Sequence, residues 1–171
     1  MSVANALNDF ANRFKQQAKT ELTKRKKNNT KALYESIKAE VKVSKNSFQL
    51  TISMLDYGKF VDAGVQGKTS KSKAPNSPFK FGSGTGKKGG LSGGVFLWVT
   101  QKKIQFKNRK TGKFLSYKAT ASLISMSVYN KGIAPTNFIK KPFENEFKKL
   151  PLEIVKAYGL TVSKLIKSTM T

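Results

Sequence analysis

Hydrophobic residues in the first two dozen positions recur with the spacing of one face of an α-helix. The apolar members of this stripe are Val3, Ala6, Leu7, Phe10, Ala11, Phe14, Ala18 and Leu22. A basic run at residues 24–27 follows, and cations are favourable at the C-terminal end of a helix. The pattern predicts an amphipathic N-terminal helix, a break at Asn28 and Asn29, and a short second helix from Thr30 to Ile37.

The next segments alternate apolar and polar residues with a period of two, which is the clearest strand pattern in the chain. The apolar members are Val41, Val43, Phe48, Leu50, Ile52 and Met54. Lys45, Asn46 and Ser47 supply a turn between the two runs. The pattern predicts an antiparallel β-hairpin at about residues 39–55 with one buried face.

The middle of the chain combines a short helical signal, a long loop and an ambiguous apolar cluster. Residues 56–64 predict a helical turn that ends at Gly64. Residues 65–90 are rich in Gly, Ser, Lys and Pro and are too long for an ordinary connection, so we expect a functional or mobile loop. Leu91 to Ile104 is compatible with a helix capped by Ser92, but its apolar cluster Val95 to Val99 is equally compatible with a buried strand, and periodicity leaves both open.

A basic loop and a further helix follow the apolar cluster. The loop covers residues 107–113 and has its turn at Thr111-Gly112. Ser116 is expected to cap a helix that runs to Asn130 and ends at Lys131-Gly132. The side chains expected to be buried on this helix are Leu123, Ile124 and Val128.

The C-terminal part of the chain predicts a linker and then a helical segment. The linker covers residues 132–142, and the helical segment covers 143–171, with a break or kink at Pro151. Together the elements predict an α+β fold. In this fold a small antiparallel sheet packs against the N-terminal and C-terminal helices, in a single domain of residues 1–171 that includes the long basic loop.

The charge of the 171-residue chain is strongly positive and unevenly distributed. Lys and Arg number 33 against nine Asp and Glu, for a net charge of +24, and residues 63–143 hold 16 basic side chains and no acidic one. Such a segment attracts polyanions or acidic protein surfaces. Abundant Lys and Asn are also typical of AT-rich genomes, which is an alternative explanation for the total charge. Only three basic residues are Arg, which disfavours sequence-specific reading of DNA bases.

The residue types that usually carry catalysis or hold metals are scarce. The chain has no His and no Cys, so the commonest general base and the usual zinc ligands are missing. Asp56 and Asp62 suggest a paired-carboxylate or divalent-metal site, but we favour one of them as a cap at a helix start and the other as a solvated side chain near the helix end. Glu144 and Glu146 are expected to favour a helix N-terminus. These observations predict a protein that is not an enzyme and has no cofactor and no metal.

A glycine-rich stretch at residues 82–90 resembles a phosphate-binding loop only superficially. A Walker A motif needs Gly where Phe81 stands and Ser or Thr where Lys88 stands. No buried strand is expected directly before it. We therefore interpret the stretch as a flexible Gly/Lys loop.

Aromatic residues alternate with basic ones around residues 106–117, a composition that can bind single-stranded nucleic acid by stacking. The aromatic members are Phe106, Phe114 and Tyr117, and the basic members are Lys107, Arg109, Lys110 and Lys113. We favour the alternative that they form a small hairpin whose aromatic side chains face the core. Nonspecific attraction of phosphates is compatible with either interpretation.

Two stretches resemble the tail-completion or neck proteins of tailed bacteriophages. Tyr57-Gly58-Lys59-Phe60-Val61-Asp62-Ala63-Gly64 is similar to the family's Tyr-x-x-Tyr/Phe-Val-Glu-x-Gly element, with Asp in place of the usual Glu. Gly132-Ile133-Ala134-Pro135-Thr136-Asn137-Phe138-Ile139-Lys140-Lys141-Pro142-Phe143 is similar to the family's Gly-Ile-x-Pro-x-x-Phe-x-x-x-Pro-Phe/Ala element. Leu33 to Ile37, Trp98-Val99 and residues 123–131 resemble further parts of the family, although the loop at 65–90 is longer and richer in Lys.

The resemblance implies a virion structural protein that forms a homo-oligomeric ring at the head–tail junction, around a channel for DNA. The expected partners are connector and tail proteins with acidic surfaces and, nonspecifically, DNA. The side chains expected to face them are Lys68, Lys71, Lys73, Lys87, Lys88, Lys107, Arg109, Lys110 and Lys113. The alternative function is nonspecific nucleic-acid binding. With no apolar run near the roughly 20 residues that span a bilayer, we expect synthesis in the host cytoplasm and no membrane contact. The resemblance further implies incorporation into the virion.

Overall fold

The computed structural model describes residues 3–25, 31–44, 47–83, 90–150 and 152–157. The chain divides into two compact units: unit 1 is Met1–Asp62 with Thr136–Thr171, and unit 2 is Ala63–Pro135. Helices and small antiparallel sheets occur together, so the α+β prediction is confirmed. The expected extent of the domain and of its segments stays a prediction.

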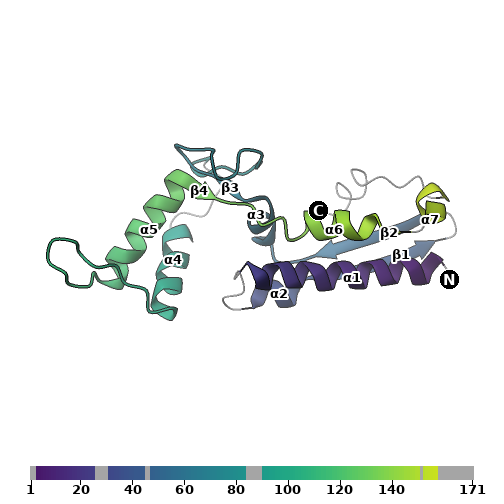
Figure 1. The fold of residues 1–171 in the computed structure, drawn as a ribbon, viewed down its shortest axis with the longest axis horizontal. Helices are drawn as coiled ribbons and strands as arrows, with labels where there is room; N and C mark the ends of the chain where they lie inside the picture. The colour runs from purple at the N-terminus through teal and green to yellow at the C-terminus, as the bar shows by residue number, and fades with distance from the viewer. Residues whose placement is uncertain (1–2, 26–30, 45–46, 84–89, 151, 158–171) are drawn as a thin grey trace. The chain divides into compact units, whose positions relative to one another are not determined.

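Unit 1 is built from one long helix, a β-hairpin and several shorter helices (Figure 1). Its elements are α1 (Val3–Lys24), α2 (Ala32–Ser36), β1 (Lys38–Ser44), β2 (Ser47–Ser53), most of α3 (Gly58–Ala63), α6 (Lys140–Phe147) and α7 (Leu152–Ala157). Strands β1 and β2 pair antiparallel, with Lys38 opposite Ser53 and Ser44 opposite Ser47. Thr30 and the expected turn residues Lys45 and Asn46 lie outside the described residues.

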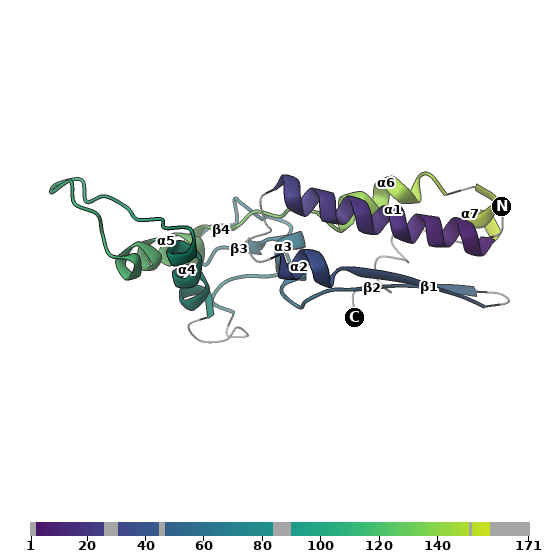
Figure 2. The same cartoon turned by 90° about the horizontal axis from the view of Figure 1, so that it is seen from below.

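The core of unit 1 lies between the helices and one face of the hairpin. Helix α1 packs along β1 on one side and against α6 on another, and Figure 2 shows the helices as a layer beside the hairpin. The predicted apolar stripe of α1 is buried from Ala6 to Leu22. On the hairpin, Leu50 is buried while Val41, Phe48 and Ile52 pack against the same cluster. The prediction of a hairpin with one buried face is therefore confirmed except at Val43, which is 43% exposed.

Helix α6 joins this core through an aromatic cluster. The ring of Phe143 meets Phe10 and Phe14 edge-on, at centroid distances of 5.5 and 5.9 Å. The helix begins at Lys140, inside the expected linker, so the predicted start was too late. Pro142 is tolerated there because a proline in the first turn of a helix needs no backbone N–H. The chain leaves helical structure between α6 and α7, as the break at Pro151 predicted, although Pro151 itself is not described.

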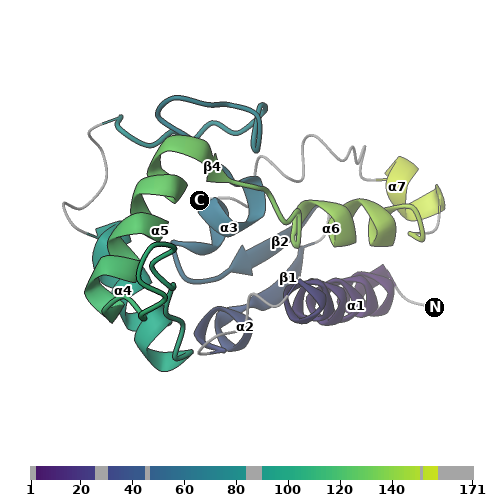
Figure 3. The same ribbon diagram turned by 60° about the vertical axis from the view of Figure 1, so that its left-hand side comes forward.

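Unit 2 consists of two packed helices and a two-stranded sheet (Figure 3). Its elements are β3 (Val65–Gln66), α4 (Gly90–Gln101), α5 (Tyr117–Lys131) and β4 (Gly132–Ile133), with β3 antiparallel to β4. The ambiguous apolar cluster is helix α4, and Ser92 lies inside it instead of capping it. At the start of α5, the hydroxyl of Ser116 accepts a hydrogen bond from Ala119 N at 3.1 Å, so the cap predicted there is confirmed.

Burial on α5 differs from the prediction. Leu123, expected in the core, is 49% exposed, and the buried positions are Thr120, Ala121 and Ser125. Ile124 and Val128 are half-buried. The buried face of α5 therefore consists of small, partly polar side chains, and α4 is the helix that packs against α5.

Several hydrogen bonds hold the described part of the connection after β3, residues 67–83. Lys68 N donates to Tyr129 O at 2.9 Å and Thr69 N donates to Asn130 O at 3.3 Å, which ties the loop to α5. The buried hydroxyl of Ser77 donates to Gly64 O at 2.7 Å. Gly64 ends α3 with φ of 72°, as predicted, and a Cβ there would lie 2.6 Å from Ile133 O.

Candidate interaction surfaces

The stretches at residues 57–64 and 132–143, which carry the family resemblance, are hydrogen-bonded to each other. Within unit 1, Thr136 donates from its backbone N to the carbonyl of Asp62 at 3.1 Å and from its hydroxyl to the carbonyl of Val61 at 2.7 Å. The Asp62 carboxylate accepts a hydrogen bond from Ile139 N at 2.7 Å. Within unit 2, the β3–β4 pair joins Val65 to Ile133. Within each unit, residues 68 or more positions apart in sequence are therefore hydrogen-bonded to each other.

Asp62 lies near the end of α3 and is buried, so the expectation of a solvated carboxylate at this helix end was wrong, whereas Asp56 is exposed. Only 4% of Asp62 is exposed. Its carboxylate accepts a hydrogen bond at the start of α6, where the N-cap residue Ile139 makes no capping hydrogen bond with its own side chain. Burial raises the pKa of Asp62 above its usual value of 3.8. Backbone N–H groups of Ile139 and Lys140 and the charge of Lys140 offset part of that rise. Asp62 thus acts as a structural link between α3 and α6.

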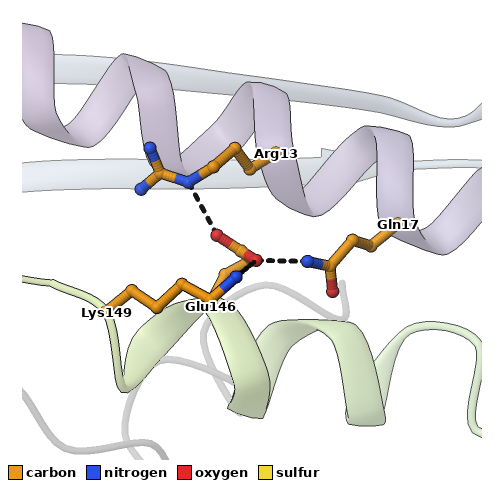
Figure 4. A network of polar contacts seen from close by, with 4 residues as sticks. All are labelled: Arg13, Gln17, Glu146 and Lys149. Carbon is orange, nitrogen blue, oxygen red and sulfur yellow. Dashed lines mark hydrogen bonds and ion pairs between the residues drawn. The ribbon is translucent and has the colours of Figure 1, made fainter.

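Glu146 forms a buried polar network with α1 (Figure 4). Its carboxylate is fully buried and accepts hydrogen bonds from Arg13 Nε at 2.7 Å, from Lys149 Nζ at 2.6 Å and from the side-chain amide of Gln17. Burial alone raises the pKa of Glu146, but the bonds from Lys149 and Arg13 and their charges outweigh it and lower the pKa. Glu146 lies near the C-terminal end of α6, so its expected role at a helix N-terminus was wrong.

The predicted contact residues fall in two regions of unit 2. Lys68, Lys71 and Lys73 lie exposed on the loop after β3, and the amine of Lys68 is 5.8 Å from the centroid of the Tyr129 ring. Lys87 and Lys88 lie outside the described residues. The remaining four lie together on the connection between α4 and α5. The structure therefore separates the predicted basic residues into a loop group and a hairpin group.

The connection between α4 and α5 forms a small hairpin, residues 105–115, which projects beyond both helices in Figure 1. Lys107 and Phe114 form an antiparallel bridge, and Leu115 N donates to Phe106 O at 2.7 Å. At the tip, Gly112 N donates to Asn108 O at 2.9 Å with Gly112 at φ of 68°, which confirms the predicted turn.

The aromatic side chains of this hairpin do not face the core, contrary to the interpretation that the sequence favoured. Phe114 is 63% exposed and Phe106 is 42% exposed, while Tyr117 is half-buried at the start of α5. The amine of Lys107 lies 5.0 Å from the centroid of the Phe114 ring. All four basic side chains of the hairpin, Lys107, Arg109, Lys110 and Lys113, are exposed. Unit 2 contains no Asp or Glu, so none of these cations has an acidic partner within its own unit.

Helix α4 carries a second surface, which the sequence analysis missed. The helix has no charged side chain, and Phe96 and Leu97 are 43% and 62% exposed. Gly93 and Gly94 share this side of the helix, and a Cβ added to either would meet nothing within 4 Å. We call these four residues the α4 face. A helix without charged side chains is normally buried. The sequence signal for this surface was a helix without charge inside a strongly basic segment.

Unit 1 also exposes an apolar set, which we call the Leu55 patch: Leu55, Tyr57 and Phe60. Their exposed fractions are 41%, 45% and 39%. The exposed acidic residue Asp56 lies between the first two in sequence. Unlike unit 2, unit 1 contains all nine carboxylate side chains of the chain.

In the part of the chain that the structure describes, no three His, Cys, Asp or Glu side chains gather in a way that could hold a metal ion. Nor does any helix within these described residues have the length and apolarity needed to cross a membrane. In comparisons of the whole chain, no family model, no curated protein and no solved structure matches it.

Proposed function

We propose that this chain is a virion structural protein of a tailed phage, which assembles as a ring at the head–tail junction and joins neighbouring virion proteins. The proposal starts from the resemblance of residues 57–64 and 132–143 to that family. The hydrogen bonds between these stretches support treating them as one motif instead of two chance matches. A mechanical role is consistent with a chain that has neither His nor Cys.

The observation that carries the assembly proposal is the uncharged, exposed α4 face. Leaving Phe96 and Leu97 in water costs the free energy that burial of large apolar side chains normally provides. The exposed cations Lys102 and Lys103 directly follow the last residue of α4. An apolar centre with a polar rim is the usual construction of a protein–protein interface.

Charge distribution indicates what covers the α4 face. Unit 2 holds 14 basic side chains and no acidic one, so two copies of unit 2 repel each other. In contrast, unit 1 offers the exposed Leu55 patch with Asp56 beside it. We therefore assign the α4 face of one copy to the Leu55 patch of the next. Such a contact joins two different surfaces, and head-to-tail contacts of this kind generate a ring when the rotation between successive copies closes.

The mass of the purified full-length chain tests this assignment. Raising the salt concentration screens the like charges and should increase the average mass measured by light scattering. Leu97→Lys should keep the chain monomeric, because it places a charge in the centre of the interface. The matched control is Leu152→Lys on α7, since Leu152 is 74% exposed and lies outside both surfaces. A chain that stays monomeric at all salt concentrations, or equal behaviour of the two variants, contradicts the assignment.

The virion role has a separate genetic test. Particles assembled without this chain should be heads that lack stable tails. Particles carrying Leu97→Lys should show the same defect, whereas Leu152→Lys particles should be normal. Infectious particles made in the absence of the chain contradict the structural role.

A further inference from the structure

We propose that the hairpin at residues 105–115 binds single-stranded nucleic acid, with phosphates on its cations and a base stacked on Phe114. Four exposed cations and two exposed aromatic rings lie within these eleven residues. Proteins that bind single strands without sequence preference combine a basic surface with aromatic side chains on which bases stack. The inference goes beyond ring assembly and does not require it.

The backbone of the hairpin is ordered by its own hydrogen bonds. Asn108 closes the tip, because its side-chain oxygen accepts from Lys110 N at 2.9 Å and from Thr111 N at 3.3 Å. At the base, Phe106 N donates to the fully buried hydroxyl of Thr120 at 3.2 Å, which anchors the hairpin to α5. A site ordered before binding loses less conformational entropy when the ligand arrives.

Phe114 is the centre of the proposed site. Residues paired across two antiparallel strands share a face, so Phe114 and Lys107 lie on the same side of the hairpin. The amine of Lys107 lies over one face of the Phe114 ring, 5.0 Å from its centroid, so a base stacks on the opposite face of the ring. Phe106, the neighbour of Lys107 in the strand, points to the opposite side.

The chemistry of the hairpin favours nucleic acid over an acidic protein and single strands over duplexes. Acidic side chains would pair with the cations without using the exposed ring of Phe114. A duplex keeps its bases stacked on each other, whereas a single strand offers them to an aromatic side chain. Arg109 is the hairpin's single Arg, and lysines act as point charges without reading base edges. Binding should therefore be independent of sequence.

Fluorescence anisotropy of a labelled thymidine oligonucleotide, titrated with the full-length chain, measures this binding. Phe114→Leu keeps an apolar side chain but removes the stacking surface, and the affinity should fall about tenfold. Phe114→Trp should preserve or increase it. Unchanged affinity in Phe114→Leu overturns the proposal. Circular dichroism of each variant verifies that the helices are intact.

A matched pair of double variants separates the hairpin from the general charge of unit 2. Arg109→Gln with Lys110→Gln removes two charges at the tip, and the salt dependence of log K should become shallower by about 1.4. Lys71→Gln with Lys73→Gln removes two exposed charges from the other basic loop and should leave that slope nearly unchanged. Equal effects of the two double variants mean diffuse attraction and overturn the proposal.

Two competing ligands and one variant complete the test. A duplex of the same length should bind more weakly and be insensitive to Phe114→Leu. Polyglutamate should displace the oligonucleotide only at much higher charge concentration. If either binds as well as the single strand, the hairpin recognises charge alone and the proposal is overturned. Leu97→Lys should retain oligonucleotide binding, so failure of ring assembly and failure of this site are distinguishable.

Discussion

The two units of this chain differ in how completely they bury their apolar side chains. Unit 1 has one contiguous cluster of 15 buried hydrophobic residues. The ion pairs found among the described residues also join residues of unit 1. In the described part of unit 2, four hydrophobic residues are buried while seven large ones are exposed. All cations of unit 2 lack an acidic residue in the same unit. Unit 1 therefore buries its apolar side chains within itself, whereas the described part of unit 2 leaves most of its large apolar side chains exposed.

The largest expected effect comes from comparing one phenylalanine in each unit. Phe143 is 1% exposed and its ring contacts those of Phe10, Phe14 and Phe147, so Phe143→Ala should reduce the free energy of unfolding by about 3–5 kcal/mol. Phe96 on α4 is 43% exposed, so Phe96→Ala should change the stability of the unassembled chain by less than about 0.5 kcal/mol. Urea denaturation followed by circular dichroism measures both.

A cost for Phe96→Ala as large as that for Phe143→Ala contradicts the division between the units. Trp98 on α4 is the single tryptophan of the chain, so its fluorescence reports on unit 2 alone. The fluorescence transition of the wild-type chain should occur at lower urea than the loss of α1 and α6 helicity.

The network around Glu146 makes the stability of unit 1 depend on pH. Because the pKa of Glu146 is lowered in the folded chain, its contribution is complete above its usual value of 4.5. The contribution is lost as the pH falls through the lower value of the folded state. Glu146→Gln should cost about 1–3 kcal/mol at neutral pH, since the amide presents donors to Arg13 and Lys149. This cost should shrink in acid, and a cost that is constant with pH contradicts the network.

Asp62 should give a smaller effect with the opposite pH dependence. Its pKa is raised in the folded chain, so the stability associated with this group decreases as the pH rises from 3.8 towards the folded value. Asp62→Ala removes the acceptor for Ile139 N and should cost about 1–2 kcal/mol. Asp62→Asn keeps an oxygen acceptor without the buried charge and should cost less. The difference between the two variants, measured by urea denaturation across pH, isolates the hydrogen bond from the charge.

The elements that the sequence predicts best are those whose signal is local and periodic. The apolar stripe of α1 and the alternating pattern of the hairpin are sufficient to predict these elements, because each element buries its apolar face against the same core. The cap at Ser116 and the turn at Gly112 depend on residues within a few positions. These parts required no knowledge of the tertiary structure.

The predictions that failed depend on partners distant in sequence. Glu146 is buried because Arg13 and Gln17 reach it from α1, which no local pattern indicates. Leu123 is exposed because α5 turns its small residues towards α4. Phe114 is a residue type that is usually buried, but it is 63% exposed because it lies on a hairpin that projects from the helices. Hydrophobic patterns indicate which side chains favour burial, but not whether residues of the same chain bury them.

The two glycines of the α4 face give the smallest expected change and the sharpest comparison of free and assembled chains. Glycine inside a helix is less stable than alanine by about 1 kcal/mol, and a Cβ at Gly93 or Gly94 meets nothing in this chain. Gly93→Ala and Gly94→Ala should therefore stabilise the unassembled chain by up to about 1 kcal/mol each. If the neighbouring copy approaches this face closely, the same variants should weaken association in light scattering. Stabilisation without any loss of association means that the neighbour does not approach α4 at these glycines.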